Sequence, residues 1–251
     1  MVDIQQINFI GNIKKALGRP GAGLPPFENL VQTAPRAEDT ELIKTIHGRE
    51  RNAHLSLLNR MMEIGPSINT EIVPAETEAD ITAAIAGIAV DRKAEWGDKK
   101  SIVTWDHPLV NSLELSTVMT QLDIPVISAQ PDTGVKREEA FRRQSETALM
   151  GVTSADFGLA EIATLTMKTR GGQPLHVSLL PSIHIAVIRL EQILENLKEL
   201  YTLLKWDPEQ QNEGITHSMS LITGPSKTAD IEATLVHGAH GPRELIIFVL
   251  T

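Results

Sequence analysis

The stretch INTEIVPAETEADITAAIAGIAVD, residues 68–91, places a strand directly before a helix. Its first part, Ile68–Val73, carries the β-branched side chains that strands favour. Thr77 and Asp80 then have the spacing of a capping box, which predicts that a helix begins between them. The apolar face of that helix recurs at helical spacing, at Ile81, Ile85, Ile88 and Ala89. A strand followed by an amphipathic helix is the repeating unit of an α/β fold.

The same alternation continues toward the middle of the chain. Strands are predicted at Lys100–Trp105 and Pro125–Ala129, and helical patterns follow them at Pro108–Leu122 and Val135–Met150. Strands joined through helices lie parallel and have right-handed crossovers. We therefore expect an α/β fold with a mixed, mainly parallel sheet and flanking helices.

The segments on either side extend this core. Helical spacing predicts helices at Ile4–Leu17 and Glu38–Ile64, with Gly48 as a weak point in the second. Residues 1–66 are expected to form an N-terminal helical extension, and residues 67–251 the α/β domain. Apolar stripes usually face a core, which favours an extension that packs on the main body over a partner-binding arm.

The pattern changes after Gly151. Several strand-like segments with short breaks follow, and Gly171-Gly172 is a hairpin-type turn signal. The predicted strands are Leu159–Lys168, Leu175–Leu180, His184–Arg189, Met219–Thr223 and Leu245–Leu250. One helix is predicted over Leu190–Trp206, because its leucines fall on a single stripe.

Composition excludes several classes of function. The net charge is −9, and the short Lys/Arg clusters form no basic patch, so nucleic acid is not an expected partner. The chain has no cysteine, and it therefore cannot use a thiol nucleophile or hold an iron–sulfur cluster through thiolates. No run reaches the roughly 18–20 apolar residues that span a bilayer, and Met1–Ile13 lacks the features of a signal peptide. We expect a cytoplasmic protein.

The segment Thr223–Glu232 is the most informative for chemistry, because it places a glycine, two hydroxyls and a lysine directly after an apolar strand. Gly224 allows a close backbone approach, while Ser226 and Thr228 can cap a short helix or donate to an anion. Lys227 adds positive charge. We expect this loop to lie beyond the carboxyl ends of the strands, where α/β sheets gather ligands. An N-capped turn with a solvated lysine fits the same spacing equally well.

Two histidines follow at His237 and His240. This spacing can bring two imidazoles to a metal, with Asp230 or Glu232 as a third ligand. A tight glycine-rich loop fits the segment equally well, and two histidines without a fixed third ligand are a weak signal for a metal. No metal site is expected.

Three further positions are candidates for chemistry. Glu161 interrupts an apolar run and is either partnered, functional or exposed on an alternating strand. His184 could act as a base, although a hydrogen-bonded structural histidine is the commoner outcome. Asp106 and His107 follow a predicted strand, a position that favours a ligand pocket but also suits an ordinary helix start.

Four stretches of the chain together resemble the lactate-utilisation protein C family, whose members contain a LUD domain. They are Thr153–Glu161, Ser178–Ile185, Gly224–Glu232 and His237–Leu245. The last two form a specific C-terminal signature, and the resemblance runs from about Thr70 to the C-terminus. One departure concerns a motif that usually reads Glu-Thr-Gly-Thr or Asp-Thr-Gly-Thr. Here Ala163 stands in place of the glycine, which disfavours close approach of a ligand to the backbone.

The resemblance implies a fold similar to that of sugar-phosphate isomerases, coenzyme A transferases and formyltetrahydrofolate cyclo-ligase. It also implies a non-redox component of a bacterial system that oxidises L-lactate to pyruvate, with iron–sulfur clusters only on partner subunits. The lack of cysteine agrees with that division of labour. We expect no cofactor in this chain and a small anionic ligand at Gly224–Glu232, with His184 and His240 as further binding residues.

An alternative is a stand-alone enzyme similar to coenzyme A transferases or sugar-phosphate isomerases. Its substrate would be a small phosphorylated or carboxylated molecule held by Ser226 and Lys227. Glu161 or Asp230 would then act as base or nucleophile. Fold analogy alone does not choose between a catalyst and a binding subunit.

Overall fold

The computed structural model describes residues 9, 11–13, 15–16, 34–95, 99–131, 134–213, 218–229, 235–237 and 241–251, with 227–229 and 235–237 as backbone only. The chain divides into two compact units, Met1–Thr40 and Glu41–Thr251. In the first unit, residues 9, 11–13 and 15–16 are helical, as the apolar spacing predicts. The strands that the structure describes all belong to the second unit.

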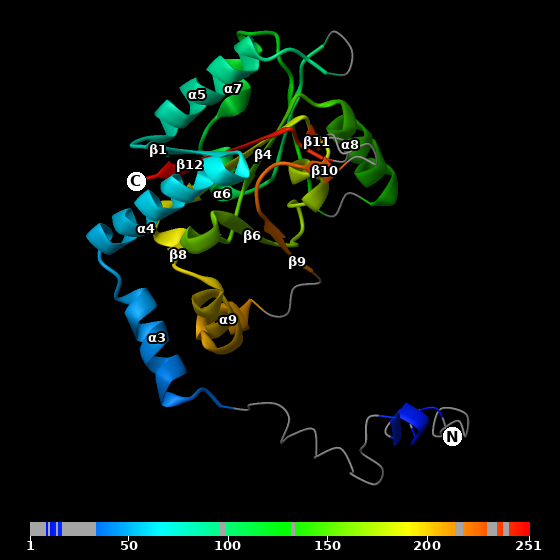
Figure 1. Cartoon of the computed structure of the whole chain (residues 1–251). Coiled ribbons are helices and arrows are strands. Elements are labelled where there is room, and N and C mark those ends of the chain that lie inside the picture. Colours follow the sequence, from blue (N-terminus) through cyan, green and yellow to red (C-terminus); the bar gives the residue numbers. More distant parts are fainter. Residues whose placement is uncertain are drawn as a thin grey trace. The chain divides into compact units, whose positions relative to one another are not determined.

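The second unit is built on a six-stranded sheet in which every neighbouring pair of strands is parallel (Figure 1). The strand order is β1-β12-β7-β4-β2-β3. These strands are β1 (Thr70–Ala75), β2 (Ile102–Thr104), β3 (Val126–Ser128), β4 (Met150–Ser154), β7 (Ile183–Arg189) and β12 (Glu244–Leu250). The parallel sheet predicted from the strand–helix alternation is confirmed.

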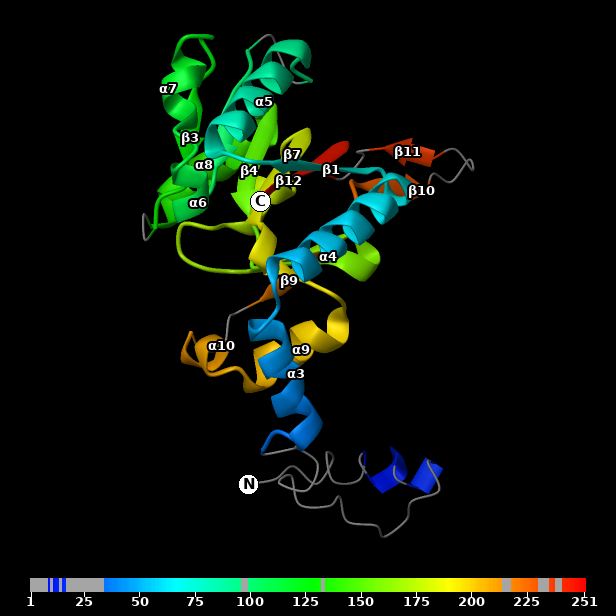
Figure 2. The ribbon, with the colours of Figure 1, turned by 90° about the vertical axis from the view of Figure 1, so that its left-hand side faces the viewer.

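Helices cover both faces of this sheet because the central strands β7 and β12 carry apolar side chains on both sides. Along β12, Ile246 and Phe248 pack with α5 (Glu78–Asp91), α6 (Pro108–Asn111) and α7 (Leu115–Thr120). The alternate residues Leu245 and Ile247 pack with α4 (Arg51–Ile64) and against Phe141 of α8 (Val135–Thr147). Figures 1 and 2 show α5 and α7 on one side of the sheet and α4 on the other.

A smaller four-stranded sheet packs on the face that α4 covers, through Leu165, Met167 and Ile193. Its order is β8-β5-β6-β9, and β6 is antiparallel to both of its neighbours. Its strands are β5 (Phe157–Leu159), β6 (Thr164–Lys168), β8 (Ile193–Leu194) and β9 (Met219–Ile222). A separate antiparallel pair is formed by β10 (Lys227–Ala229) and β11 (Leu235–His237).

The remaining elements are short or lie around this core. The α-helices are α3 (Ala37–His47), α9 (Leu197–Trp206) and α10 (Pro208–Asn212). The 3-10 helices are η1 (Gly65–Ile68), η2 (Ala160–Ile162), η3 (Leu175–Ser178) and η4 (Leu190–Gln192). The helical pattern predicted over residues 38–64 is interrupted after His47, at the weak point predicted at Gly48. Because α4 buries Leu58 and Met61 in the core, packing on the main body is confirmed for this helix. The domain boundary at residues 66–67 stays a prediction.

The capping box at the start of α5 is confirmed. The Thr77 hydroxyl accepts a hydrogen bond from the Asp80 amide at 3.1 Å, and the Asp80 carboxylate accepts one from the Thr77 amide at 3.1 Å. A reciprocal cap of this kind satisfies two backbone donors that the helix itself leaves free.

The helix predicted over Leu190–Trp206 is wrong in its first half. Ile193 and Leu194 form β8 and pair with β5, so their apolar side chains are buried by a sheet and not by a helix face. Asn196 then accepts hydrogen bonds from the amides of Lys198 and Glu199, which fixes the start of α9. The strand predicted at Leu175–Leu180 is also wrong, because Leu175–Ser178 is the 3-10 helix η3.

Candidate functional site

The loop that the sequence singled out borders a cavity of about 270 Å³, here called the loop pocket. Its lining includes Ser178, His184, Gly224, Ser226, Pro242 and Leu245. His184 and Leu245 are the second residues of β7 and β12, so the pocket lies at the amino ends of the parallel strands. The predicted position beyond the carboxyl ends is therefore wrong. The reason is that β9, which leads into the loop, belongs to the smaller sheet and runs antiparallel to β6.

The helix start predicted at Ser226 is also wrong, because Lys227–Ala229 is the strand β10. The Ser226 amide donates to the carbonyl of Pro242 at 2.8 Å, which ties the loop to the segment before β12. A helix N-terminus therefore does not contribute to anion binding here. Gly224 is required by the backbone, since its φ is +74° and an added Cβ would lie 2.5 Å from the carbonyl oxygen of Ile68.

His184 is the polar group at the base of the loop pocket. It is fully buried, and the hydroxyl of Thr153 on β4 lies 2.8 Å from its Nε2 atom. Burial lowers the pKa of His184 to about 3, so the imidazole is neutral at physiological pH. The side chain can exchange hydrogen bonds with a neighbour, but it brings no positive charge to the pocket.

The other predicted site residues are placed as follows. Glu161 lies on η2 with about half of its side chain exposed, 3.6 Å from Arg60, and it does not line the loop pocket. Lys227 and Thr228 pair with β11 in register with His237 and Val236. Asp230, Glu232 and His240 lie outside the described residues. Glu161 and Asp230 as catalytic residues stay a prediction.

A second cavity, the strand-end pocket, lies at the opposite end of the sheet and has a volume of about 360 Å³. Its lining includes Trp105, His107, Asp156, Arg170, Gln173 and Gln192. The first three follow the carboxyl ends of β2 and β4, and Gln192 follows that of β7. In open parallel sheets this is the edge at which ligands bind.

The charged groups around the strand-end pocket are paired in a chain. Arg170 donates to Asp156 at 2.5 Å and also to Glu213. Lys168, whose side chain is 4% exposed, donates to Glu213 at 2.8 Å. Asp156 also accepts the Lys168 amide at 2.7 Å. Two cations and two anions therefore compensate each other in this cluster.

The pKa values of these groups follow from the pairing. Burial works to lower the pKa of Arg170, but its hydrogen bonds to Asp156 and Glu213 outweigh burial and raise it above the usual range. The hydrogen bond from Arg170 lowers the pKa of Glu213 to about 2, with a further contribution from Lys168. Burial, and after it the charge of Arg170, lowers the pKa of His107. Arg170 and Glu213 are therefore charged at neutral pH, while His107 is neutral.

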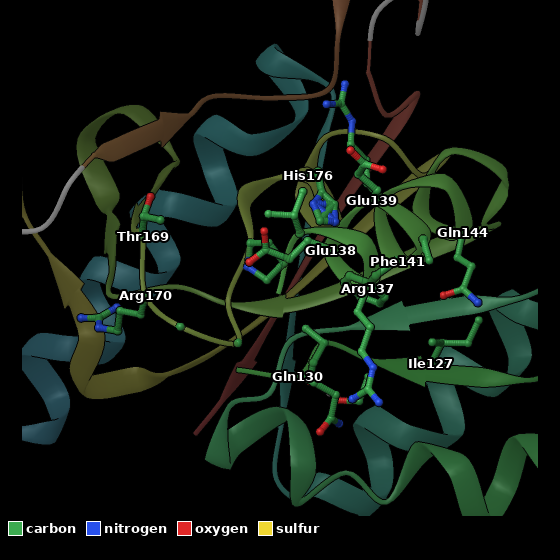
Figure 3. A pocket seen from close by; sticks show the side chains of 18 residues that line it. Ile127, Gln130, Arg137, Glu138, Glu139, Phe141, Gln144, Thr169, Arg170 and His176 are labelled. Carbon is green, nitrogen blue, oxygen red and sulfur yellow. Dashed lines mark hydrogen bonds between the residues drawn. The ribbon is translucent and has the colours of Figure 1, made fainter. Parts of the chain in front are cut away.

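A third and larger cavity, the α8 cavity, adjoins the strand-end pocket and has a volume of about 690 Å³ (Figure 3). Residues of α8 form one wall, and the turn at Gly171 and Gly172 forms another. Arg170 borders both cavities, and in Figure 3 its guanidinium points away from the residues of α8. Phe141 contacts His176 edge to face at 5.3 Å within this cavity.

Sequence patterns indicate the strand-end pocket only in part. The sequence points to Asp106 and His107 after a predicted strand and to Gly171-Gly172 as a turn, but nothing in its pattern points to Asp156 or Arg170. The missing signal was β4, whose sequence Met-Gly-Val-Thr-Ser has no strong apolar pattern. Had β4 been recognised, Asp156 two residues beyond it would have been a candidate by position.

The part of the chain that the structure describes has neither a clustered metal-ligand set nor a membrane-spanning helix. No group of three or more histidine, aspartate and glutamate residues there could hold a metal ion. No helix there has the length and apolar character that crossing a bilayer requires.

Comparisons with known proteins were made on sequence and on structure. A model of the LUD domain family matches residues 58–250. "Uncharacterized protein YkgG" of Escherichia coli (strain K12) is 27% identical over 244 residues, covering 96% of each chain. "Lactate utilization protein C" of Bacillus velezensis is 28% identical over 249 residues, covering 94% of this chain and 92% of that one. A crystal structure of a DUF162 family protein from Deinococcus radiodurans covers 79% of this chain and 98% of its own, with a TM-score of 0.51 and 18% identity. That structure supports the fold alone.

Proposed function

The chain belongs to the LUD domain family, and from this premise we propose that it is a cytoplasmic component of a bacterial L-lactate utilisation system. The name lactate utilization protein C, carried by several similar proteins, supports this role. Without cysteine the chain has no thiolate ligands for an iron–sulfur cluster. Oxidation of L-lactate to pyruvate releases two electrons, and partner subunits with such clusters would accept them.

We further propose that the loop pocket binds a small carboxylate. One observation supports this proposal. The family resemblance rests on stretches that are distant in the sequence, and residues of three of these stretches line the same cavity. The loop pocket is lined by Ser178 and His184, by Gly224 and Ser226, and by Gly241 and Pro242. Thr153 bonds to His184, and so the fourth stretch supports the same pocket from beneath.

The chemistry of the loop pocket suits a short carbon chain with a polar end. The cavity has apolar lining residues in Leu179, Ile222 and Leu245, and Ser226 lines the same cavity. Lys227 follows Ser226 directly in the chain and is the cation nearest to it in sequence. A cavity of about 270 Å³ is near the lower end of small-molecule sites, which fits a ligand of only a few carbon atoms.

The described residues give less support to the alternative, a stand-alone enzyme. Glu161 is half exposed and lies near Arg60, and its amide donates to the carbonyl of Glu195. Glu161 is therefore a partly exposed residue that does not line the loop pocket. A binding role is therefore the function that the described residues support best.

Titration calorimetry of the full chain with L-lactate, pyruvate and inorganic phosphate tests the ligand. We expect a carboxylate to bind, and Ser226→Ala and Lys227→Gln each to weaken binding about tenfold or more, as loss of a charge-assisted hydrogen bond does. Lys198→Gln, on the exposed face of α9, is the matched control and should bind as the wild type does. Failure of both carboxylates to bind, or equal affinity in all three variants, would exclude the loop pocket as their site.

Growth tests the pathway separately. A strain lacking this gene should grow poorly on L-lactate as sole carbon source and normally on pyruvate. The wild-type gene should restore growth, and the Lys227→Gln gene should restore it only in part. Normal growth of the deletion strain on L-lactate would contradict the pathway assignment.

A further inference from the structure

The strand-end pocket contains a side-chain amide oxygen that lacks a hydrogen-bond partner among the described residues. Gln173 is 8% exposed and lines the pocket, yet its Oε1 atom is buried and has no partner among the described residues. Its Nε2 atom makes only a long contact, 3.5 Å, to the carbonyl of Asp106. Buried polar groups are nearly always hydrogen-bonded, so an unpaired acceptor beside a cavity indicates a donor that enters from the cavity.

A hydrogen-bond donor lines the same pocket. The Nδ1 atom of His107 accepts the amide of Leu109 at 3.2 Å, which places the imidazole proton on Nε2. His107 lines the pocket and its ring is neutral, because burial lowers its pKa. The pocket therefore offers an N–H donor at His107 and an acceptor at Gln173, neither of which carries a charge.

The charges nearby argue against an anion or a cation as the ligand. Arg170 is already hydrogen-bonded to Asp156 and Glu213, and Lys168 to Glu213. Because these carboxylates already compensate the charge of Arg170 and Lys168, an anionic ligand would gain little net attraction there, and a cationic ligand would meet carboxylates that are already paired. Breaking the pair with Asp156, whose side chain is 9% exposed, would be costly, because the carboxylate left behind stays desolvated.

We propose that the strand-end pocket binds a small uncharged polyhydroxylated molecule, such as a sugar or a polyol. Hydroxyl groups both donate and accept, which matches the acceptor at Gln173 and the donor at His107. Trp105 and Phe157 line the same pocket and offer apolar surface to a carbon skeleton. The volume of about 360 Å³ is sufficient for a monosaccharide. This site is distinct from the carboxylate site proposed at the loop pocket and does not depend on it.

Binding is measured on the full chain by calorimetry and by the NMR signal of the Trp105 indole N–H, with D-ribose, D-glucose and myo-inositol as probes. The indole is a suitable reporter because it lines the pocket while its N–H donates to the carbonyl of Pro174 at 2.9 Å. At least one probe should bind with a dissociation constant on the order of 1 mM or tighter and shift the Trp105 signal. L-lactate and inorganic phosphate should leave that signal unchanged.

Gln173→Met keeps the side-chain length and removes both polar atoms. It should weaken binding of the sugar or polyol about tenfold, the factor that corresponds to one lost hydrogen bond. Gln121→Met, at the exposed C-terminal end of α7, is the control and should bind as the wild type does. Ser226→Ala should also leave this binding unchanged, which separates it from the loop pocket.

Three results would overturn the assignment. The first is that none of the three uncharged probes shifts the Trp105 signal of the wild-type chain, a measurement that does not depend on any variant folding. The second is that L-lactate or phosphate shifts it in their place. The third is that a probe binds with equal affinity to the wild type and to a folded Gln173→Met chain.

Discussion

The loop pocket and the strand-end pocket lie at opposite ends of one parallel sheet. The polar side chains are neutral at one end and ion-paired at the other. At the amino ends, His184 is neutral and buried, and apolar residues such as Leu245 surround it. At the carboxyl ends, Arg170 forms ion pairs with Asp156 and Glu213. The polar side chains of the loop pocket are therefore uncharged, whereas those around the strand-end pocket form ion pairs.

The largest expected effect comes from the amino end. Gly151 on β4 is the register partner of His184, and an added Cβ would lie 1.9 Å from the carbonyl oxygen of Val177. Because a backbone atom cannot rotate away, Gly151→Ala should lower the free energy of unfolding by about 3 kcal/mol or more. Urea denaturation measures this.

Gly87→Ala is the matched control for that substitution. Gly87 lies in α5 with no atom within 4 Å of an added Cβ, so alanine should raise stability by about 0.5–1 kcal/mol through helix propensity. Equal effects of the two substitutions would show that β4 and η3 are not packed as closely as the distances indicate.

Arg170→Met tests the carboxyl end. The substitution leaves Asp156, with 9% of its side chain exposed, without its cation. We expect a loss of about 2–3 kcal/mol in the free energy of unfolding. Carboxylate binding at the loop pocket should not change. Arg142→Met removes only an exposed pair with Glu146 and should cost well under 1 kcal/mol.

The pH dependence of stability distinguishes the two ends further. The folded-state pKa of His184, about 3, lies below its unfolded value near 6.5. Its stabilising contribution is therefore full above pH 6.5 and is lost as the pH falls toward 3, because only the unfolded chain takes up the proton. Between pH 6.5 and pH 5 the expected loss is about 1.5 kcal/mol.

His184→Gln should remove that part of the pH dependence, and His107→Asn, which keeps a capping side chain, should remove less. The pKa of His107 is lowered too, but the ring is less completely buried. Denaturation at pH 6.5 and pH 5 gives both differences. An unchanged pH dependence in His184→Gln would mean that this histidine is already accessible to protons in the folded state.

The smallest effect is expected behind the loop pocket, at Ala163. Its φ is +44°, a left-handed conformation that glycine adopts more easily, and Thr164 beside it lies 2.7 Å from the Thr223 hydroxyl. Ala163→Gly should relieve about 1 kcal/mol of strain and lose about 0.8 kcal/mol of methyl burial. The two nearly cancel, so the urea midpoint should stay the same. A clear fall in the midpoint would mean that burial of the methyl group stabilises the protein by more than the backbone strain costs.

Prediction of secondary structure from the sequence succeeded where one element buries one clear apolar pattern. β1 and α5 are examples, since a β-branched run and a capping box define them locally. It failed where burial came from distant segments. β4 is fully buried between β7 and β2 although two of its five residues are threonine and serine, and Ile193–Leu194 joined a sheet through pairing with β5.

The sequence by itself determined the α/β class, the parallel crossovers, the lack of thiol chemistry and the loop at Gly224–Ser226 as a binding candidate. Each of these depends on residue type or local spacing, which do not depend on how the chain folds. Only the tertiary structure decided that this loop lies at the amino ends of the strands, and that Arg170 meets Asp156 and Glu213 at the carboxyl ends. Those placements depend on which strands pair, and pairing joins residues whose separation in sequence leaves no periodic signal.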